Sequence, residues 1–595
     1  MGGLMLWGKT TLCVALGLLL TTSALHAAES YEVTTERGVT VTMRDGVILR
    51  ADIYRPKADG QFPVLLQRTP YNKSGGVAFG LKAAARGYVV IIQDVRGRYT
   101  SDGEWYTFKN EPNDGYDTVE WAAALPYSNG KVGMWGGSYV GATQMLAAIA
   151  HPPHLAGICP VVTASNYHEN WTYQGGAFEQ WFNQSWTSGL AQDTFNRSVV
   201  KNTNALGGMW KLPLASYPLF NFSDGSAPAS TASLAPYFLD WLAHPSYDQY
   251  WKQLSIEEHF GDITVPILHV AAWYDIFQGG SLRNYMGIKA RGGSEAARRG
   301  QHLFVTIGGH AGSGRKIGDV DFGPAAAEFD EDEITLKWYD YLFKGVQNEF
   351  AGKPVKIFVM GANQWREEDD WPLARAQNTK YFLHSTKSAN SLRGDGTLST
   401  VSPRSEAADH YVYDPSNPVP TVGGPLCCDS NHLAPGPRDQ RAVEARDDVL
   451  IYTAPAFAQD TEVTGPVSLE LFARSSAVDT DFTAKLVDVG PDGFAQNLTE
   501  GIVRARYRDS REKADLINPA QVYKFTIDLW STSNVFRKGH ALRLEISSSN
   551  FPRFDRNLNT GEDPAFARNY VSATNTVYHD AEHPSALILP VVPSH

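Results

Sequence analysis

Clusters of basic residues, cysteines and long apolar segments are all scarce in this 595-residue sequence. Lys and Arg together number 52 against 64 Asp and Glu, and no run of basic residues occurs along the chain. Nucleic acids and anionic membrane surfaces select proteins with clustered positive charge, so we expect neither as a partner. Beyond the N-terminal segment, no apolar stretch reaches the about 20 residues that a membrane-spanning helix needs.

Cysteine is rare, with four in the whole chain, which excludes a fold built on a framework of disulfides. Cys427 and Cys428 are adjacent in the stretch PLCCDS. They could form a vicinal disulfide, but from the sequence we expect two thiols that are unpaired or separately packed. No spacing of Cys or His is typical of a metal site, so we expect neither a metal nor another cofactor.

The first 27 residues are typical of a secretory signal peptide. Lys9 precedes an uninterrupted apolar stretch, residues 12–20, and small residues follow up to Ala27, where we expect cleavage. The apolar stretch is too short to be a membrane anchor. We therefore expect a periplasmic or secreted protein that is not attached to a membrane once the peptide is removed.

Two separate segments, residues 28–165 and 256–350, alternate short apolar β-rich runs with helical runs. This alternation indicates an α/β domain with a parallel sheet covered by helices on both faces. Between the two segments, residues 166–255 are dense in aromatic residues and contain no strand–helix–strand unit. We therefore predict that one α/β domain is interrupted by an inserted, mainly helical cap.

Residues 351–595 have a different pattern from the rest of the chain. Runs such as VSLELFARS and ALRLEISSS are rich in β-formers and are separated by Gly, Pro, Asn and Asp. This spacing predicts a C-terminal all-β domain, for which a two-sheet jelly roll is the expected arrangement.

The stretch MWGGSYVGATQ, residues 134–144, connects a strand pattern to a helix pattern. A sharp strand-to-helix turn lifts a serine hydroxyl above the sheet, at the N-terminus of the helix, as a nucleophile requires. Gly136 and Gly137 permit such a turn before Ser138. The alternative is an ordinary glycine-rich turn, since Val140 takes the place of the second glycine in the common G-x-S-x-G pattern. The flanking strand and helix favour Ser138 as a nucleophile.

A nucleophilic serine needs a base and an orienting carboxylate, which follow it in the order Asp, His in this type of fold. In open α/β sheets, sites gather at the carboxyl ends of the strands. Asp275 ends the run VPILHVAAWYD, and His310 follows HLFVTI on a Gly-Gly loop, whereas Asp262 and His302 stand at the opposite edge. Separately, Asp275 could be a turn residue and His310 a loop residue. Their order along the chain and their shared position at the carboxyl edge of the sheet together favour a catalytic role with Ser138.

The developing oxyanion of an acyl-transfer reaction needs hydrogen-bond donors placed in advance. The backbone N–H of Tyr139, the residue after the serine, is one candidate. The loop after the run PVLLQRT supplies another, the hydroxyl of Tyr71 in RTPYNK. From the residues alone, Tyr71 is better interpreted as a packing residue with a solvated hydroxyl.

Several stretches together resemble the cocaine-esterase-like serine hydrolases, a group related to X-Pro dipeptidyl-peptidases, glutaryl acylases and α-amino-acid ester hydrolases. They are RTPYNK, QDVRGRYTSDGEW, GGSYVGATQ, AAWYD and GPRDQRAVEARDDVLIYTA. The resemblance spans about residues 31–592 and implies an α/β-hydrolase domain with a helical cap and a C-terminal jelly roll.

The resemblance also implies roles for individual residues. It assigns the nucleophile to Ser138, the acid to Asp275, the base to His310 and an oxyanion-hole hydroxyl to Tyr71. One departure is IGGHAG around His310, where relatives often have Gly-Pro-Trp shortly before the histidine. In DVRGRYTSDG we expect a structural ion pair between Asp94 and Arg96.

These patterns predict a serine hydrolase that cleaves a small-molecule ester or amide through an acyl-enzyme, as an esterase or acylase. Ile276 and Phe277 follow Asp275 and are apolar, which argues against recognition of a free amino group. An acyl pocket lined by Phe277 and Trp171 is the corresponding expectation. Glu169 and Glu179 in the cap are the alternative, since their carboxylates could bind a free amino group.

Three alternatives stay open on the sequence: an X-Pro dipeptidyl-peptidase, an α-amino-acid ester hydrolase, and a carbohydrate-binding protein on a degenerate hydrolase scaffold. The residues are also compatible with a homo-oligomer.

Overall fold

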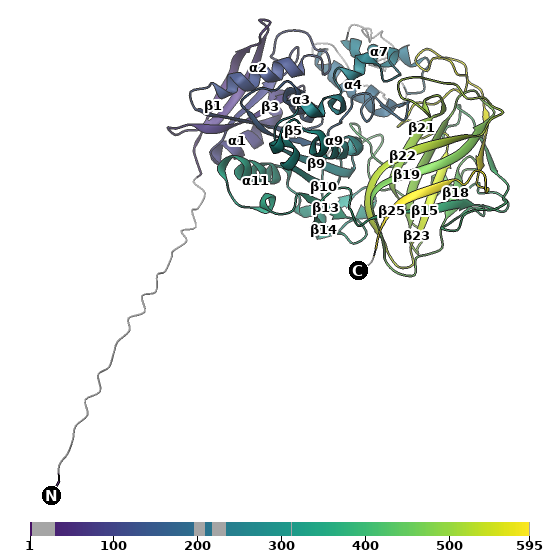
Figure 1. Ribbon diagram of the computed structural model, residues 1–595. Helices are drawn as coiled ribbons and strands as arrows, with labels where there is room; N and C mark the ends of the chain where they lie inside the picture. The colour runs from purple at the N-terminus through teal and green to yellow at the C-terminus, as the bar shows by residue number, and fades with distance from the viewer. Residues whose placement is uncertain (3–29, 195–208, 217–233, 311, 594–595) are drawn as a thin grey trace.

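The computed structural model describes residues 1–2, 30–194, 209–216, 234–310 and 312–593 (Figure 1). Apart from its first two residues, the predicted signal peptide lies outside the described residues. None of the helices in these ranges is both long and apolar enough to cross a membrane. In Figure 1 an α/β domain and a β domain lie side by side, with the cap helices α4 and α7 near their junction.

The α/β domain is built on a ten-stranded sheet in the order β1-β2-β4-β3-β5-β6-β9-β10-β13-β14. The pairs from β4 to β13 are parallel, and the two edges are antiparallel. The strands are β1 (Val33–Thr42), β2 (Ile48–Pro56), β3 (Phe62–Thr69), β4 (Val89–Asp94), β5 (Ser128–Gly137), β6 (Leu155–Val161), β9 (Ile267–Tyr274), β10 (Gln301–Gly309), β13 (Val355–Val359) and β14 (Gln364–Glu368).

Helices cover both faces of this sheet because its central strands are apolar on both sides. In β4, Val89 and Ile91 join one hydrophobic cluster with α2 and α3, whereas Val90 and Ile92 join a second cluster with α1 and α11. This is the period of two that a strand imposes on its side chains. The helices of this domain are α1 (Val77–Ala85), α2 (Glu111–Ala123), α3 (Tyr139–Ile149), α9 (Gln278–Arg291), α10 (Glu295–Arg299) and α11 (Glu331–Lys344).

The α/β-hydrolase class predicted from the sequence is confirmed, but the sheet extends past the predicted domain end at residue 350. Strand β13 lies beyond that residue and pairs with β10, and β14 pairs with β13, in the same sheet. A β-rich run such as VKIFVMG indicates a strand without indicating which sheet it joins, so the boundary at residues 350 and 351 does not mark the end of this sheet. A small hairpin, β11 (Lys316–Ile317) and β12 (Val320–Asp321), precedes α11.

The cap follows β6 and packs mainly through aromatic side chains. Trp186 on α4 and Trp241 on α7 stack with ring centroids 6.2 Å apart, and both are buried. The described cap elements are β7 (Tyr173–Gln174), β8 (Ala177–Phe178), α4 (Gln180–Thr194), α7 (Pro236–Ala243) and α8 (Gln249–Lys252). Parts of the predicted cap, residues 195–208 and 217–233, lie outside the described residues.

The C-terminal domain is all β, as predicted, and its eleven strands form one connected ladder. The two-sheet jelly roll expected for it stays a prediction. Its elements are β15 (Gln377–His384), β16 (Thr397–Ser399), β17 (Asp409–Tyr413), α12 (Arg441–Glu444), β18 (Leu450–Thr453), β19 (Thr461–Ser475), β20 (Asp481–Val489), β21 (Ala495–Arg504), β22 (Tyr523–Phe536), β23 (Ala541–Ser547), β24 (Ala573–Tyr578) and β25 (Ala586–Val592).

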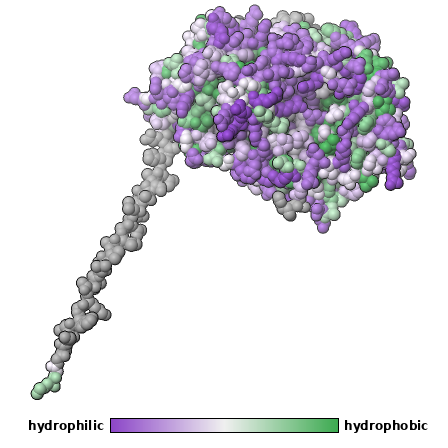
Figure 2. Space-filling view, in the orientation of Figure 1, coloured by the Kyte–Doolittle hydropathy of each residue, from purple (hydrophilic) through white to green (hydrophobic). Residues whose placement is uncertain are grey.

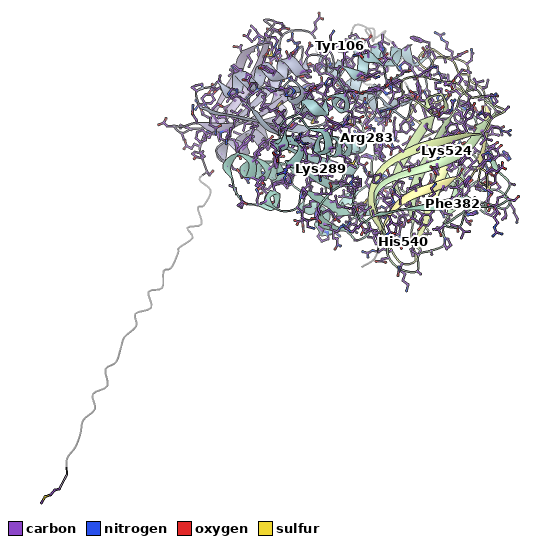
Figure 3. The ribbon with its side chains drawn as sticks, viewed as in Figure 1. Tyr106, Arg283, Lys289, Phe382, Lys524 and His540 are labelled. Atoms are coloured by element: carbon purple, nitrogen blue, oxygen red, sulfur yellow. A yellow bond between two sulfur atoms is a disulfide. The ribbon has the colours of Figure 1, made fainter. Side chains whose placement is uncertain are left out.

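Ion pairs connect the β domain to the α/β domain and to the cap. Near the junction in Figure 3, Arg283 of α9 donates to Asp528 of β22 at 2.8 Å. Deeper inside, the fully buried Arg553 donates to Glu500 of β21 at 2.5 Å and lies 3.4 Å from Glu179 of the cap. Burial raises the pKa of Glu179 to about 7, against the effect of Arg553, which lowers it. The cap and the β domain therefore share one buried ion network.

Arg553→Leu is expected to destabilise the protein by about 3–5 kcal/mol, because it removes the guanidinium between two buried carboxylates and leaves only Lys485, 3.8 Å from Glu500, to offset their charge. Urea denaturation followed by tryptophan fluorescence measures the effect. Arg393→Leu is the matched control: its ion pair with Asp447 is exposed on both sides, and we expect a change below about 1 kcal/mol. Equal midpoints for the two variants would contradict this role of Arg553.

The face shown in Figure 2 is mostly hydrophilic, with hydrophobic residues gathered in small separate areas. Large apolar side chains are instead concentrated in the interior clusters described above. This face offers no extended apolar surface for docking.

Candidate active site

Ser138 sits in the sharp turn between β5 and α3. Its φ is 61°, a left-handed value that is uncommon for a residue with a side chain and typical of a strained functional turn. Its backbone N–H donates to the carbonyl of Val161 at 2.9 Å. Gly136 is required here: its φ is 123°, and a Cβ atom at that position would lie 2.5 Å from Cγ1 of Val140. The turn leaves the Ser138 hydroxyl on the carboxyl edge of the sheet.

Asp275 and His310 lie at the same edge, because each directly follows a parallel strand. Asp275 comes after β9, which ends at Tyr274, and His310 comes after β10, which ends at Gly309. In the sheet order, β5 is separated from β9 only by β6, and β10 is next to β9. Residues far apart in the sequence are thus brought to three nearby strand ends.

The three side chains form a continuous hydrogen-bonded row. His310 Nε2 is 2.8 Å from Ser138 Oγ, and His310 Nδ1 is 2.6 Å from Asp275 Oδ1. Asp275 is fully buried, and its other oxygen accepts the backbone N–H of Phe277 at 2.8 Å. The carboxylate is thereby held with one oxygen facing the imidazole. This arrangement can move a proton from the serine hydroxyl to the histidine.

Tyr71 brings a phenol to the same point. Its hydroxyl accepts the indole N–H of Trp186 at 3.0 Å and interacts with the Ser138 side chain and the Tyr139 backbone. Desolvation raises the pKa of Tyr71 above its ordinary value, against the smaller lowering effect of these hydrogen bonds. A phenol of ordinary pKa is already protonated near neutral pH, so the Tyr71 hydroxyl keeps its proton and is available as a donor.

Tyr139 itself is turned into the interior. Its hydroxyl accepts the backbone N–H of Phe108 at 2.7 Å and donates to Glu111 at 3.1 Å. Burial and the Glu111 carboxylate raise its pKa well above the usual value. The Tyr139 side chain anchors the first turn of α3, so only its backbone N–H is directed to the site.

A cavity of about 580 Å³ opens above Ser138 and His310. Its wall includes residues that the sequence does not assign to the site: Arg98, Trp186, Glu331 and Cys428. Trp186 could have been suspected from the aromatic density of the cap. Nothing in the local sequence marks the other three, because each reaches the cavity from a different part of the chain.

The expectation of an acyl pocket lined by Trp171 and Phe277 is wrong. Both side chains are fully buried and stack on each other with ring centroids 4.4 Å apart, and neither borders the cavity. Phe277 does support the imidazole of His310 edge-on, at 5.1 Å between ring centroids. The two rings lie in the second layer because the cap helix α4 places Trp186 and Leu190 in front of them, at the cavity.

The two cap carboxylates considered for binding an amino group do not border the cavity either. Glu179 belongs to the Arg553 network, and Glu169 accepts the backbone N–H of Gly175 at 2.9 Å. Both carboxylates thus serve the packing of the cap.

Two further expectations differ from the structure. Asp94 does not pair with Arg96: it accepts the backbone N–H of Lys73, and Arg96 turns to Asp114 at 2.6 Å, because Arg96 follows the end of β4 and reaches α2. A disulfide joins Cys427 and Cys428, so the expectation of separate thiols is wrong. The backbone at Cys428 has a φ of 88°, a conformation that residue types alone do not reveal.

The α/β-hydrolase sheet, together with the hydrogen-bonded row of Ser138, His310 and Asp275 at its edge, defines the class of this protein as a serine hydrolase. The chain belongs to the cocaine-esterase-like family of serine hydrolases, which confirms the resemblance in the sequence. Residues 45–312 match the X-Pro dipeptidyl-peptidase (S15 family) model, and residues 348–588 match the X-Pro dipeptidyl-peptidase C-terminal non-catalytic domain.

Named relatives cover nearly the whole chain. Cocaine esterase of Rhodococcus sp. (strain MB1 Bresler) is 38% identical over 584 residues, which is 93% of this chain and 98% of the relative. An aminopeptidase structure from the marine sediment archaeon Thaumarchaeota archaeon has a TM-score of 0.82 at 26% identity, covering 95% of this chain and 97% of the other. An α-amino acid ester hydrolase structure shares the fold, with a TM-score of 0.80 at 24% identity and coverage of 97% and 100%.

Proposed function

We propose that this protein is a carboxylic ester hydrolase or acylase that uses Ser138 as nucleophile, His310 as general base and Asp275 as the orienting acid. The observation that carries the proposal is the hydrogen-bonded row of the three side chains, with 2.8 Å from Ser138 Oγ to His310 and 2.6 Å from His310 to Asp275. These are the separations that proton transfer requires.

In the first step, Ser138 Oγ attacks the acyl carbon while His310 Nε2 takes the hydroxyl proton. Asp275 holds the imidazole in the tautomer with its proton on Nδ1 and stabilises the imidazolium that forms. The imidazolium then protonates the leaving alcohol or amine, which leaves an acyl-Ser138 ester. A water molecule, activated by the same imidazole, hydrolyses that ester and regenerates the serine.

The oxyanion of the tetrahedral intermediate would be stabilised by the Tyr139 backbone N–H and the Tyr71 hydroxyl. The N–H of Tyr139 lies in the first turn of α3, where the helix dipole favours negative charge. Trp186 supports this role of Tyr71, because its indole N–H occupies a lone pair of the phenol oxygen and leaves the phenol proton free for the substrate.

Tyr71→Phe is expected to lower kcat about 10²- to 10³-fold with a much smaller change in KM, because the lost donor acts on the transition state. Hydrolysis of p-nitrophenyl esters at saturating substrate measures it. Tyr106→Phe, at a residue labelled in Figure 3, is the control, since the Tyr106 hydroxyl donates to Asp240 in the cap instead. An unchanged kcat for Tyr71→Phe would remove the phenol from the oxyanion site.

An active-site fluorophosphonate tests the proposed nucleophile directly. Mass spectrometry should locate the label on Ser138, and a panel of neutral p-nitrophenyl esters should be hydrolysed by the unlabelled protein only. A carbohydrate-binding protein on a hydrolase scaffold would take up no label and hydrolyse no ester, and that result would overturn the proposal.

A second candidate function, the hydrolysis of substrates that carry a free amino group, is favoured by Glu331. This first residue of α11 borders the cavity, and its carboxylate has no hydrogen bond or ion pair with any residue that the structure describes. It could receive an ammonium group. Rates for Gly-Pro-anilide and aminoacyl esters, compared with those for neutral esters of the same leaving group, decide between the two candidates.

We also propose that the protein is exported and processed near Ala27, on the strength of its N-terminal sequence. N-terminal sequencing of the protein recovered from the periplasm or the medium tests this, and an unprocessed N-terminus in the cytoplasm would contradict it.

A further inference from the structure

Two cysteines and the histidine of the proposed triad meet at the wall of the active-site cavity. The potential ligand atoms of His310, Cys427 and Cys428 all lie within 4.8 Å of one another. Cys428 borders the cavity and is exposed, whereas Cys427 is buried behind it with 4% of its surface accessible. Two sulfurs and an imidazole nitrogen are the donor set that thiophilic cations such as Zn²⁺ and Cd²⁺ prefer.

We propose that Cys427, Cys428 and His310 form a redox-gated inhibitory site for a thiophilic divalent cation. In the disulfide form the two sulfurs are bonded to each other and cannot act as thiolate ligands. In the dithiol form they can, together with the imidazole. The inhibitory effect rests on the proposed function of His310, whereas the binding of the cation does not.

The opening step is an ordinary thiol–disulfide exchange with a dithiol reductant. The reductant gives two electrons and two protons to the Cys427–Cys428 bond, which breaks, and the reductant becomes a disulfide. Cation binding then releases the thiol protons to solvent. Tetrahedral ligands about 2.3 Å from Zn²⁺ are separated by roughly 3.7 Å, so loss of the bond lets the sulfurs move apart to the spacing that the cation needs.

The hydrogen bond that Asp275 accepts from His310 determines which imidazole nitrogen is free to bind a cation. Nδ1 is held at 2.6 Å by the buried carboxylate, so Nε2 carries the lone pair for a cation. A carboxylate behind a metal-binding histidine is a common supporting arrangement. Nε2 is also the atom that faces Ser138 Oγ at 2.8 Å. A cation on Nε2 therefore removes the base from the serine, and hydrolysis stops.

The experiment compares Cd²⁺ binding by the full-length protein in two redox states. One sample is kept oxidised; the other is reduced with a dithiol, which is then removed by gel filtration without oxygen. We expect the reduced protein to bind one Cd²⁺ per chain with ultraviolet thiolate-to-metal charge-transfer absorption, and the oxidised protein to show none. Zn²⁺ at the same concentration should inhibit ester hydrolysis at least about 10-fold in the reduced protein only.

Three variants assign the site. Cys427→Ser/Cys428→Ser should abolish the absorption, and His310→Gln should weaken Cd²⁺ binding at least about 10-fold. Cys159→Ser is the matched control and should bind like the unmodified protein, because Cys159 is fully buried elsewhere and burial raises its pKa to about 12. Should the double variant not fold, the oxidised and reduced forms of the unmodified chain still give the comparison.

Two results would overturn the inference: no Cd²⁺-dependent absorption in the reduced protein, or absorption that persists in the double cysteine variant. Failure of the proposed function has a different signature. In that case the oxidised, metal-free protein would neither hydrolyse esters nor take up the fluorophosphonate, while the reduced protein would still bind Cd²⁺.

Discussion

Ser138→Ala is expected to lower kcat/KM for p-nitrophenyl esters about 10⁴-fold or more, because no other group in the row can form the acyl-enzyme. The residual rate would come from the oxyanion donors and from substrate binding alone. Folding should be preserved, since the turn is formed by the backbone and alanine only removes an oxygen atom. Steady-state kinetics with a stopped-flow search for a burst phase measures both effects.

Ser188→Ala is the matched control for this variant. Ser188 lies on α4 near the cavity but not in its wall, and its hydroxyl donates to the Gln184 carbonyl at 2.8 Å. Its removal should change kcat/KM less than about 2-fold. Wild-type-like esterase activity in Ser138→Ala would end the hypothesis of a serine nucleophile at this position.

Asp275→Asn is expected to lower kcat about 10⁴-fold while leaving the overall geometry in place. The amide can present its NH₂ group to His310 Nδ1, which then holds the imidazole in the tautomer that carries its proton on Nε2. That tautomer cannot accept the proton of Ser138. The same ester assay, with circular dichroism to verify folding, measures the loss.

Asp262→Asn provides the comparison at the opposite edge of the sheet. Asp262 lies 2.8 Å from His259 and precedes β9, so its neutralisation should leave kcat nearly unchanged. A loss below about 10-fold for Asp275→Asn would show that another group orients His310.

Much of the fold could be predicted because its signals are local. The apolar runs that became β3, β4, β5, β9 and β10 fall within a few residues of their predicted places, since a strand buried on both faces must be apolar along its whole length. Knowing that Ser138, Asp275 and His310 each follow such a strand was enough to place them at one edge. The wall of the cavity was not predictable in this way.

The errors share a physical cause, which is contact between distant segments. The position of Phe277 after Asp275 predicts a pocket residue, but α4 packs in front of it. Glu179 was considered for substrate binding, but Arg553 lies hundreds of residues away in the sequence and only packing brings the two together. The sequence does not predict that β13 and β14 extend the α/β sheet, because the pairing of β13 with β10 and of β14 with β13 depends on tertiary contacts.

By itself, the sequence determined the order of strands and helices, the glycine-permitted turn at Ser138, and the edge at which Asp275 and His310 emerge. Each of these follows from side-chain size and periodicity within about ten residues. Only the tertiary structure decided that Trp186 supports Tyr71, that Glu331 borders the cavity, and that the Cys427–Cys428 pair stands beside His310. Those contacts join segments whose relative positions depend on the packing of three domains, and no local pattern encodes them.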